Sequence, residues 1–129
     1  MITPGITNRI ETMVTKDNIA GAVGSGTIEV FATPQMINMM EMCCCLSVDE
    51  FMEEGCTTVG SNVNVSHISA TPMGMKVWCE SNLTAVEGKK LTFEVKAYDE
   101  KGLIGEGTHE RFIINVEKFM ARTMKKLEG

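Results

Sequence analysis

The spacing of hydrophobic residues along this chain changes near Gly55. Between residues 34 and 46, apolar side chains fall on nearly every side of a helix, which predicts a helix that is buried all round. Thr33 is a suitable N-cap, Pro34 suits the first helical position, and Gly55 is a natural stop. We therefore predict one helix over residues 34–54, with a length of ~30 Å.

After Gly55, apolar and polar residues alternate, and this period of two predicts strands. Turns that contain glycine separate the alternating runs, as in an antiparallel meander. The predicted strands are residues 59–65, 75–86, 91–98 and 103–116, with an earlier strand at residues 9–14. Two further segments are a mobile loop over residues 16–27, which holds three glycines, and a short basic helix over residues 118–127.

One apolar helix followed by four long antiparallel strands predicts an α+β domain of the hotdog type. In this fold a curled antiparallel β-sheet wraps a long central helix. A concave sheet can cover the helix on most sides, which explains why the helix lacks a polar face. The chain has 129 residues, which suits a single core, so we expect residues 1–129 to form one hotdog domain.

The composition excludes several classes of function. A net charge of −5 argues against a nucleic-acid or anionic-membrane surface, where basic patches are usual. No apolar stretch approaches the ~20 residues of a membrane span, and the N-terminal residues show no signal peptide. Five cysteines, three of them adjacent, make a poor disulfide framework and indicate free thiols in a reducing cytoplasm. Adjacent cysteines on a helix cannot converge on one zinc ion, so we expect no metal.

Glu41 is the only charged residue in the apolar run from Met36 to Leu46. A carboxylate in such surroundings must be paired, hydrogen-bonded or held neutral, and this is a common device for acid, base or nucleophile chemistry. His67 shares a strand face with apolar residues and therefore points toward the helix. A core histidine bonded to a backbone carbonyl is the simpler interpretation, but a Glu41–His67 pair would satisfy both groups and create a general base near neutral pH.

Three other residues have both a plain and a functional interpretation. Thr33 is an N-cap by the plain one, but its hydroxyl and the free N–H groups of the helix start can also face a ligand. Gly60 is either an ordinary strand glycine or a point where a ligand approaches the backbone closely. Asn38 either forms a hydrogen bond within the helix or positions substrate. The polar run 107–111 says little by itself, because strand ends are often solvated.

Several of these residues belong to motifs that occur in a fixed order. The motifs are Val30-Phe31-Ala32-Thr33, Met39-Met40-Glu41, Gly60, His67, Gly107-Thr108-His109-Glu110-Arg111 and Val116-Glu117-Lys118-Phe119. In this order they resemble the fluoroacetyl-CoA thioesterase-like family of hotdog proteins. The resemblance implies a dimer that hydrolyses acyl-CoA thioesters without metal or cofactor. It implies catalytic roles for Thr33, Glu41 and His67, and active-site positions for Gly60 and Arg111.

The chain departs from that family upstream of Thr33. The fluoroacetyl-specific enzyme has an aromatic-rich lid there, which recognises the fluorinated acyl group, whereas residues 13–29 of this chain contain no aromatic residue. We therefore expect a thioesterase for a small acyl group that is not selective for fluoroacetyl. The carrier, which is either CoA or a protein-bound pantetheine, stays open.

Thioester hydrolysis needs a nucleophile, a base and donors for the developing oxyanion. We expect His67 to be the base, with either Thr33 or Glu41 as the nucleophile. Thr33 and Glu41 are eight residues apart in the sequence. In one continuous helix that separation is a rise of ~12 Å, so either the helix starts later and Thr33 folds back, or Thr33 comes from a second copy of the chain. We favour a site at an interface between two copies, which the resemblance also implies.

Two other functions fit the same pattern. A hotdog dimer that holds an acyl thioester or a small aromatic ligand without turning it over would use the same pocket. A hydratase or dehydratase fits less well, because those hotdog proteins typically carry an aspartate close behind the histidine. Here His67 is followed by Ile68, Ser69 and Ala70.

Overall fold

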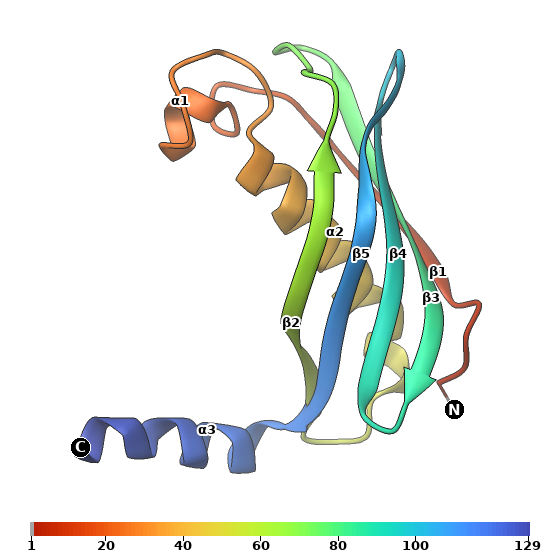
Figure 1. Ribbon diagram of the computed structural model, residues 1–129, viewed down its shortest axis with the longest axis vertical. Helices are drawn as coiled ribbons and strands as arrows, with labels where there is room; N and C mark the ends of the chain where they lie inside the picture. The colour runs from red at the N-terminus through yellow and green to blue at the C-terminus, as the bar shows by residue number, and fades with distance from the viewer. Residues whose placement is uncertain (1) are drawn as a thin grey trace.

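Helices and strands account for most of residues 2–129, the part of the chain that the computed structural model describes (Figure 1). The helices are α1 (Ala20–Val23), α2 (Thr33–Val48) and α3 (Val116–Met124), and two 3₁₀ turns are η1 (Asp49–Phe51) and η2 (Lys125–Glu128). The strands are β1 (Thr7–Met13), β2 (Cys56–His67), β3 (Lys76–Glu87), β4 (Lys90–Asp99) and β5 (Gly102–Asn115). Each predicted strand corresponds to an observed one, with ends shifted by no more than three residues.

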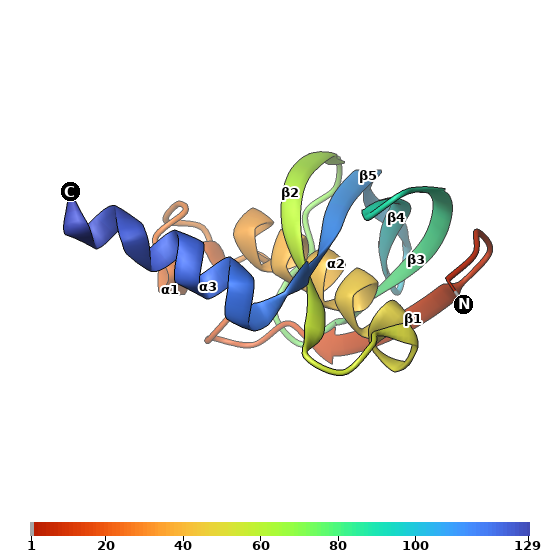
Figure 2. The ribbon, with the colours of Figure 1, turned by 90° about the horizontal axis from the view of Figure 1, so that it is seen from below.

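The strands form one antiparallel sheet in the order β1-β3-β4-β5-β2. The sheet curls around α2, which crosses its concave face (Figures 1 and 2). The predicted α+β hotdog architecture is therefore confirmed. No helix within residues 2–129 is long and apolar enough to cross a membrane.

The core lies between α2 and the inward face of the sheet. Phe93 and Val95 of β4 are fully buried because every second residue of the strand points toward the helix. Met36, Met40 and Cys43 of α2 are buried against them in the same cluster. Cysteine and methionine therefore act here as core hydrophobes.

The limits of α2 differ from the prediction. The helix begins at Thr33 and ends at Val48, so the predicted range of residues 34–54 starts one residue late and runs six residues too far. Val48 is the last fully buried residue of the helix, and the chain then turns through η1. The N-cap is Ala32, and no side chain of the described residues caps this end. The interpretation of Thr33 as an N-cap is wrong, and its hydroxyl is available for another partner.

The prediction that this helix is buried all round is also wrong. Met42 and Leu46 are 48% and 49% exposed. A single curled sheet covers only the side of α2 that faces it, so the opposite side stays open. A contiguous apolar face of this kind is typical of a surface that meets another protein chain.

Strand β2 lies at one edge of the sheet and pairs only with β5 in the described part of the chain. The five residues from Gly60 to Asn64 are all exposed. The register with β5 shifts between Gly60 and Asn62, which is a β-bulge at Ser61. A long edge strand with exposed backbone groups is a template for pairing with another strand.

Phe93→Ala tests the placement of the core. The side chain is 0% exposed, so its truncation should lower the free energy of unfolding by about 3–5 kcal/mol. Phe112→Ala is the matched control, because Phe112 on the neighbouring strand is 39% exposed and should cost less than about 1 kcal/mol. Urea denaturation of both variants measures the difference, and equal losses would contradict the described core.

Candidate functional site

Thr33 and His67 meet at one end of the molecule. Thr33 is the first residue of α2 and His67 is the last residue of β2, and the Thr33 Oγ1 and His67 Nδ1 atoms are 2.7 Å apart. Gly105 of β5 allows this approach, because a Cβ there would lie 2.6 Å from the Met36 sulfur. A glycine at that position lets the first turn of α2 pack closely on the sheet.

A cavity of about 310 Å³ opens at this pair. Its walls come from the segment around α1, from the start of α2 and from the residues that follow β2, and they include Ala20, Val30, Thr33, His67 and Ile68. The segment predicted to be a mobile loop thus contains a short helix and forms one wall of the cavity.

The His67 imidazole is set up to act as a base. Burial lowers its pKa from the ordinary value of 6.5, and the nearby Ser69 backbone opposes this only in part. The ring is therefore neutral near pH 7. With the Thr33 hydroxyl donating to Nδ1, the proton of the neutral ring lies on Nε2. The Nε2 atom is buried and has no hydrogen-bond partner among residues 2–129.

A second cluster forms around Arg111 on β5. The guanidinium is nearly buried, and its Nη1 atom lies 3.6 Å from the Glu41 Oε2 atom, whose side chain is 41% exposed. The Nε and Nη2 atoms donate to the Thr58 hydroxyl at 2.8 Å and to the Thr58 carbonyl at 2.9 Å. Arg111 is thus held in one orientation and faces Glu41 with its remaining donor.

His109 supports Arg111 from behind, and sequence reasoning missed it. Its Nδ1 atom donates to the Asn62 carbonyl at 2.7 Å, which leaves Nε2 free to accept from Arg111 Nη1 at 3.2 Å. Burial lowers the pKa of His109, and the Arg111 charge lowers it further, so the ring is neutral. The sequence does contain a signal for His109, because it stands two residues before Arg111 and therefore shares the inward face of the same strand.

Gly60 lies at the point where β2 passes Glu41. A Cβ at this position would lie 2.8 Å from Glu41 Oε2 and 3.2 Å from His109 Cε1. Only a glycine lets the carboxylate rest against the backbone of β2. The interpretation of Gly60 as a point of close approach fits this geometry, and the approaching group is the side chain of Glu41.

The expected pair of Glu41 and His67 does not form within one chain. Among residues 2–129 no hydrogen bond or ion pair joins them, and the charged partner of Glu41 is Arg111. The physical reason is that α2 is continuous from Thr33, which sets Thr33 and Glu41 about 12 Å apart along the helix axis. Glu41 is also half-exposed and not buried as expected, because it lies on the side of α2 that the sheet leaves open.

Asn38 lies apart from both clusters. It is exposed and lines a separate groove between α2 and β1, together with Gln35 and Met42. Its assignment to substrate binding stays a prediction.

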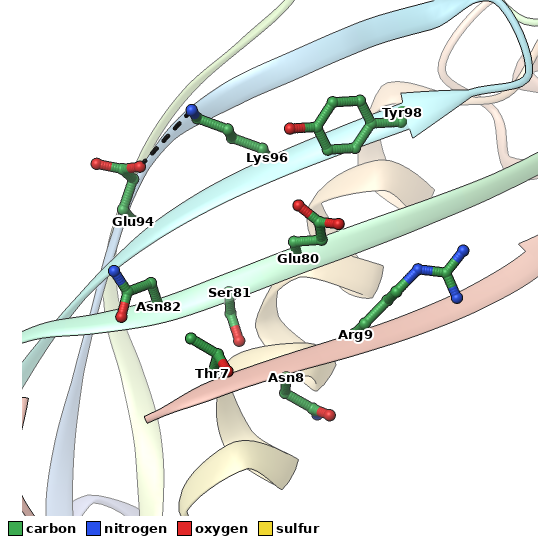
Figure 3. A pocket seen from close by; sticks show the side chains of 9 residues that line it. All are labelled: Thr7, Asn8, Arg9, Glu80, Ser81, Asn82, Glu94, Lys96 and Tyr98. Carbon is green, nitrogen blue, oxygen red and sulfur yellow. Dashed lines mark ion pairs between the residues drawn. The ribbon is translucent and has the colours of Figure 1, made fainter. Parts of the chain in front are cut away.

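Another groove, of about 430 Å³, lies along β1, β3 and β4 and contains none of the predicted site residues (Figure 3). Arg9, Glu80, Lys96 and Tyr98 line it, and Lys96 forms an exposed ion pair with Glu94 at 3.9 Å. These residues are mutually compensating surface charges, so the candidate chemistry lies in the Thr33–His67 and Glu41–Arg111 clusters.

Comparisons with known proteins agree with this choice. Residues 14–117 match the family described as fluoroacetyl-CoA-specific thioesterase. The fluoroacetyl-CoA thioesterase of Streptantibioticus cattleyicolor is 41% identical over 98 residues, which are 76% of this chain and 70% of that protein. The solved structure of the fluoroacetyl-CoA thioesterase FlK superposes with a TM-score of 0.92 at 32% identity, over 98% of both chains. A Thermus thermophilus protein of the thioesterase superfamily superposes with a TM-score of 0.91 at 31% identity, over 99% of this chain and 95% of that one.

Gly60→Ala tests the contact between β2 and Glu41. The new methyl group would meet the end of a flexible side chain, so the fold should lose less than about 1 kcal/mol while the carboxylate moves away from Arg111. Gly105→Ala is the comparison, because its methyl group would also lie 2.8 Å from the Ser66 backbone oxygen, which cannot move cheaply. Thermal unfolding should show a small loss for Gly60→Ala and a clearly larger one for Gly105→Ala. The reverse order would contradict the packing described.

Proposed function

Because the chain belongs to the fluoroacetyl-CoA-specific thioesterase family, we propose that it hydrolyses small acyl-CoA thioesters as a homodimer with a composite site. In each site, Thr33 and His67 come from one copy and Glu41 comes from the other. The observation that carries this proposal is that each chain holds two separate parts of the site, and neither part is complete by itself. His67 Nε2 is buried without a partner in residues 2–129, and the Glu41 carboxylate is 41% exposed beside an edge strand.

The edge strand β2 supports the dimer. Its exposed stretch is residues 60–64, and a symmetric antiparallel pair of two copies would satisfy the open backbone groups. In such a pair, two residues that lie opposite each other on the two strands have residue numbers that add up to twice the residue number at the two-fold axis. An axis within residues 62–64 therefore places His67 of one copy opposite residues 57–61 of the other, where Gly60 and Glu41 lie.

This pairing would complete the hydrogen-bond pattern of a catalytic triad. The Thr33 hydroxyl donates to His67 Nδ1, and His67 Nε2 would donate to Glu41 of the partner subunit. Arg111, fixed by Thr58 and His109, holds that carboxylate in place.

The reaction then follows from these positions. His67 removes a proton from water or from Thr33, the oxygen attacks the acyl carbon, and the C–S bond breaks. The thiolate of CoA takes the proton back from the imidazolium, and water supplies the carboxylic acid product. The free N–H group at the start of α2 or the backbone N–H of Gly60 holds the developing oxyanion. With Glu41 as the nucleophile instead of Thr33, the carboxylate bonds to the acyl carbon as the C–S bond breaks, and water deprotonated by His67 then opens the resulting anhydride, its proton passing to the thiolate. No metal or cofactor takes part in either route.

The acyl cavity has no aromatic lid residue in the segment 13–29, and its α1 wall is built from small side chains. We therefore propose a short or branched acyl substrate without selectivity for fluoroacetyl. The cysteines within residues 2–129 are free thiols, which supports a reducing cytoplasm as the location.

His67→Ala and Glu41→Gln test the reaction. Release of thiol from a panel of short, branched and aromatic acyl-CoAs should fall by at least about 100-fold in each variant, because each loses a group that acts on the reacting atoms. Glu94→Gln, on the outer face of the sheet, is the matched control and should keep the parent rate. Near-normal rates in both site variants would overturn the assignment. Tight binding by the parent protein without any thiol release would favour a non-catalytic binding protein.

Mixing the two inactive variants tests the composite site. A dimer of one Glu41→Gln chain and one His67→Ala chain has one site with both groups intact and one site with neither. Refolding an equal mixture should restore about a quarter of the parent rate, because half of the dimers are mixed and one of their two sites is whole. A mixture that stays inactive would show that each site draws its residues from a single chain.

A further inference from the structure

The C-terminal arm, defined here as α3 and η2 (residues 116–128), extends away from the rest of the molecule. Figures 1 and 2 show it leaving the end of β5 and running out beyond the β2 edge of the sheet. None of the nine residues of α3 is buried against residues 2–129. The Asn115 side chain accepts from the Lys118 N–H, and the Val116 N–H donates to the Gly55 carbonyl. These bonds fix the direction in which the arm leaves the sheet.

The arm has two opposite faces. At 100° per residue, Val116, Met120 and Met124 fall on one side, and these apolar residues are 43%, 45% and 51% exposed. The other side carries the basic residues of the arm. These are Lys118, Arg122, Lys125 and Lys126. A helix this short is marginal in water without tertiary packing, so its apolar side needs a partner.

A second apolar patch lies at the other end of the molecule, at the mouth of the Thr33–His67 cavity. Ile68, which follows His67 and lines the cavity, is 58% exposed. Ile28 lies in the same loop as the cavity residues Ser25 and Val30 and is 68% exposed. The arm begins at the end of the molecule where β2 starts, whereas this patch lies where β2 ends. The two patches therefore cannot meet within one chain.

Antiparallel pairing of two β2 strands brings the opposite ends of two copies side by side. We infer that the apolar side of the arm docks on the second copy of this chain, over the mouth of its Thr33–His67 cavity. The inference rests on the proposed dimer and deepens it. The arm comes from the same copy that supplies Glu41, so both reach the site from the partner.

Docked in this way, the arm presents its basic side to the solvent at the mouth of the acyl site. The arm carries four basic and two acidic residues, a net charge of +2, and the whole chain has −5, so the remainder has −7. The phosphate groups of CoA are strongly anionic and would meet mainly repulsion elsewhere on this surface. The arm thus supplies the cations for the CoA phosphates and makes CoA the preferred carrier.

Two substrates distinguish the role of the basic side of the arm from the role of its apolar side. Arg122→Gln/Lys126→Gln should raise KM for an acyl-CoA about tenfold for each cation removed from a phosphate, with little change for the matching acyl-pantetheine, which lacks phosphates. Met120→Ser/Met124→Ser should lower kcat/KM for both substrates, because the cavity mouth opens. Lys101→Gln, a basic residue in the β4–β5 turn, is the control and should change neither. Equal effects of the basic variant on both substrates, or no effect of either double variant, would overturn the inference.

The mixed dimers described above test whether the arm acts on the partner. Their one intact site uses His67 from the Glu41→Gln chain and the arm of the His67→Ala chain. Met120→Ser/Met124→Ser placed in the His67→Ala chain should reduce the restored rate, and the same change in the Glu41→Gln chain should leave it intact. The opposite result would show that the arm covers its own chain. A parent protein that releases no thiol would refute the proposed function itself, whereas an active parent with arm variants of normal rate refutes only this inference.

Sedimentation with phosphatidylglycerol vesicles checks the other partner that a basic amphipathic helix can take. The parent protein should stay in the supernatant at physiological ionic strength. Vesicle binding that is abolished in Met120→Ser/Met124→Ser while both substrates keep their kinetics would assign the arm to a membrane surface and overturn its docking on a second copy.

Discussion

The packing of α2 against the concave face of one curled sheet is the constraint on which the rest of the molecule depends. Five strands can enclose a long helix on one side only. The enclosed side takes Met36, Met40 and Cys43 out of water and supplies the hydrophobic stabilisation. The other side keeps Met42 and Leu46 half-exposed, with Met42 in the groove between α2 and β1, and it leaves Glu41 half-exposed beside Gly60 of the edge strand β2. The chain therefore folds with one side of α2 open, which is the side that the proposed dimer would cover, and the candidate chemistry lies along the border between the covered and the open side.

Arg111 shows how a buried charge is stabilised at the border between the covered and the open side of α2. A guanidinium that is 8% exposed is costly unless its donors are satisfied. Thr58 accepts from Nε and Nη2, and neutral His109 accepts from Nη1, whose second N–H faces the half-exposed Glu41. Because the cation is fixed from behind, the position of the carboxylate is fixed as well. Gly60 completes the arrangement by allowing Glu41 to lie against the strand.

The sequence predicted the elements well, because hydrophobic period and turn residues are local properties. It was less successful where the outcome depends on how far the sheet curls. The acidic residues after Val48 look compatible with a longer helix, but the helix ends where its packing against the sheet ends. Glu41 stands in an apolar run and was expected to be buried beside His67, whereas only the curvature of the sheet decides which side of α2 stays open. His109 was missed because its importance comes from a contact between neighbouring strands, which a linear pattern does not display.

The proposed site divided between two copies would also explain the methionines among the exposed apolar residues. Met42 on α2 and Met120 and Met124 on α3 all lie outside the core of the single chain. Methionine has a flexible and polarizable side chain that fits irregular surfaces with little strain. A wall of methionine contributed by the partner can adapt to acyl groups of different shape, whereas rigid aromatic rings would select one. In the proposed dimer, the absence of aromatic residues within residues 13–29 and the apolar side of the C-terminal arm thus have the same consequence, which is a cavity that closes over the acyl group with little selectivity for its shape.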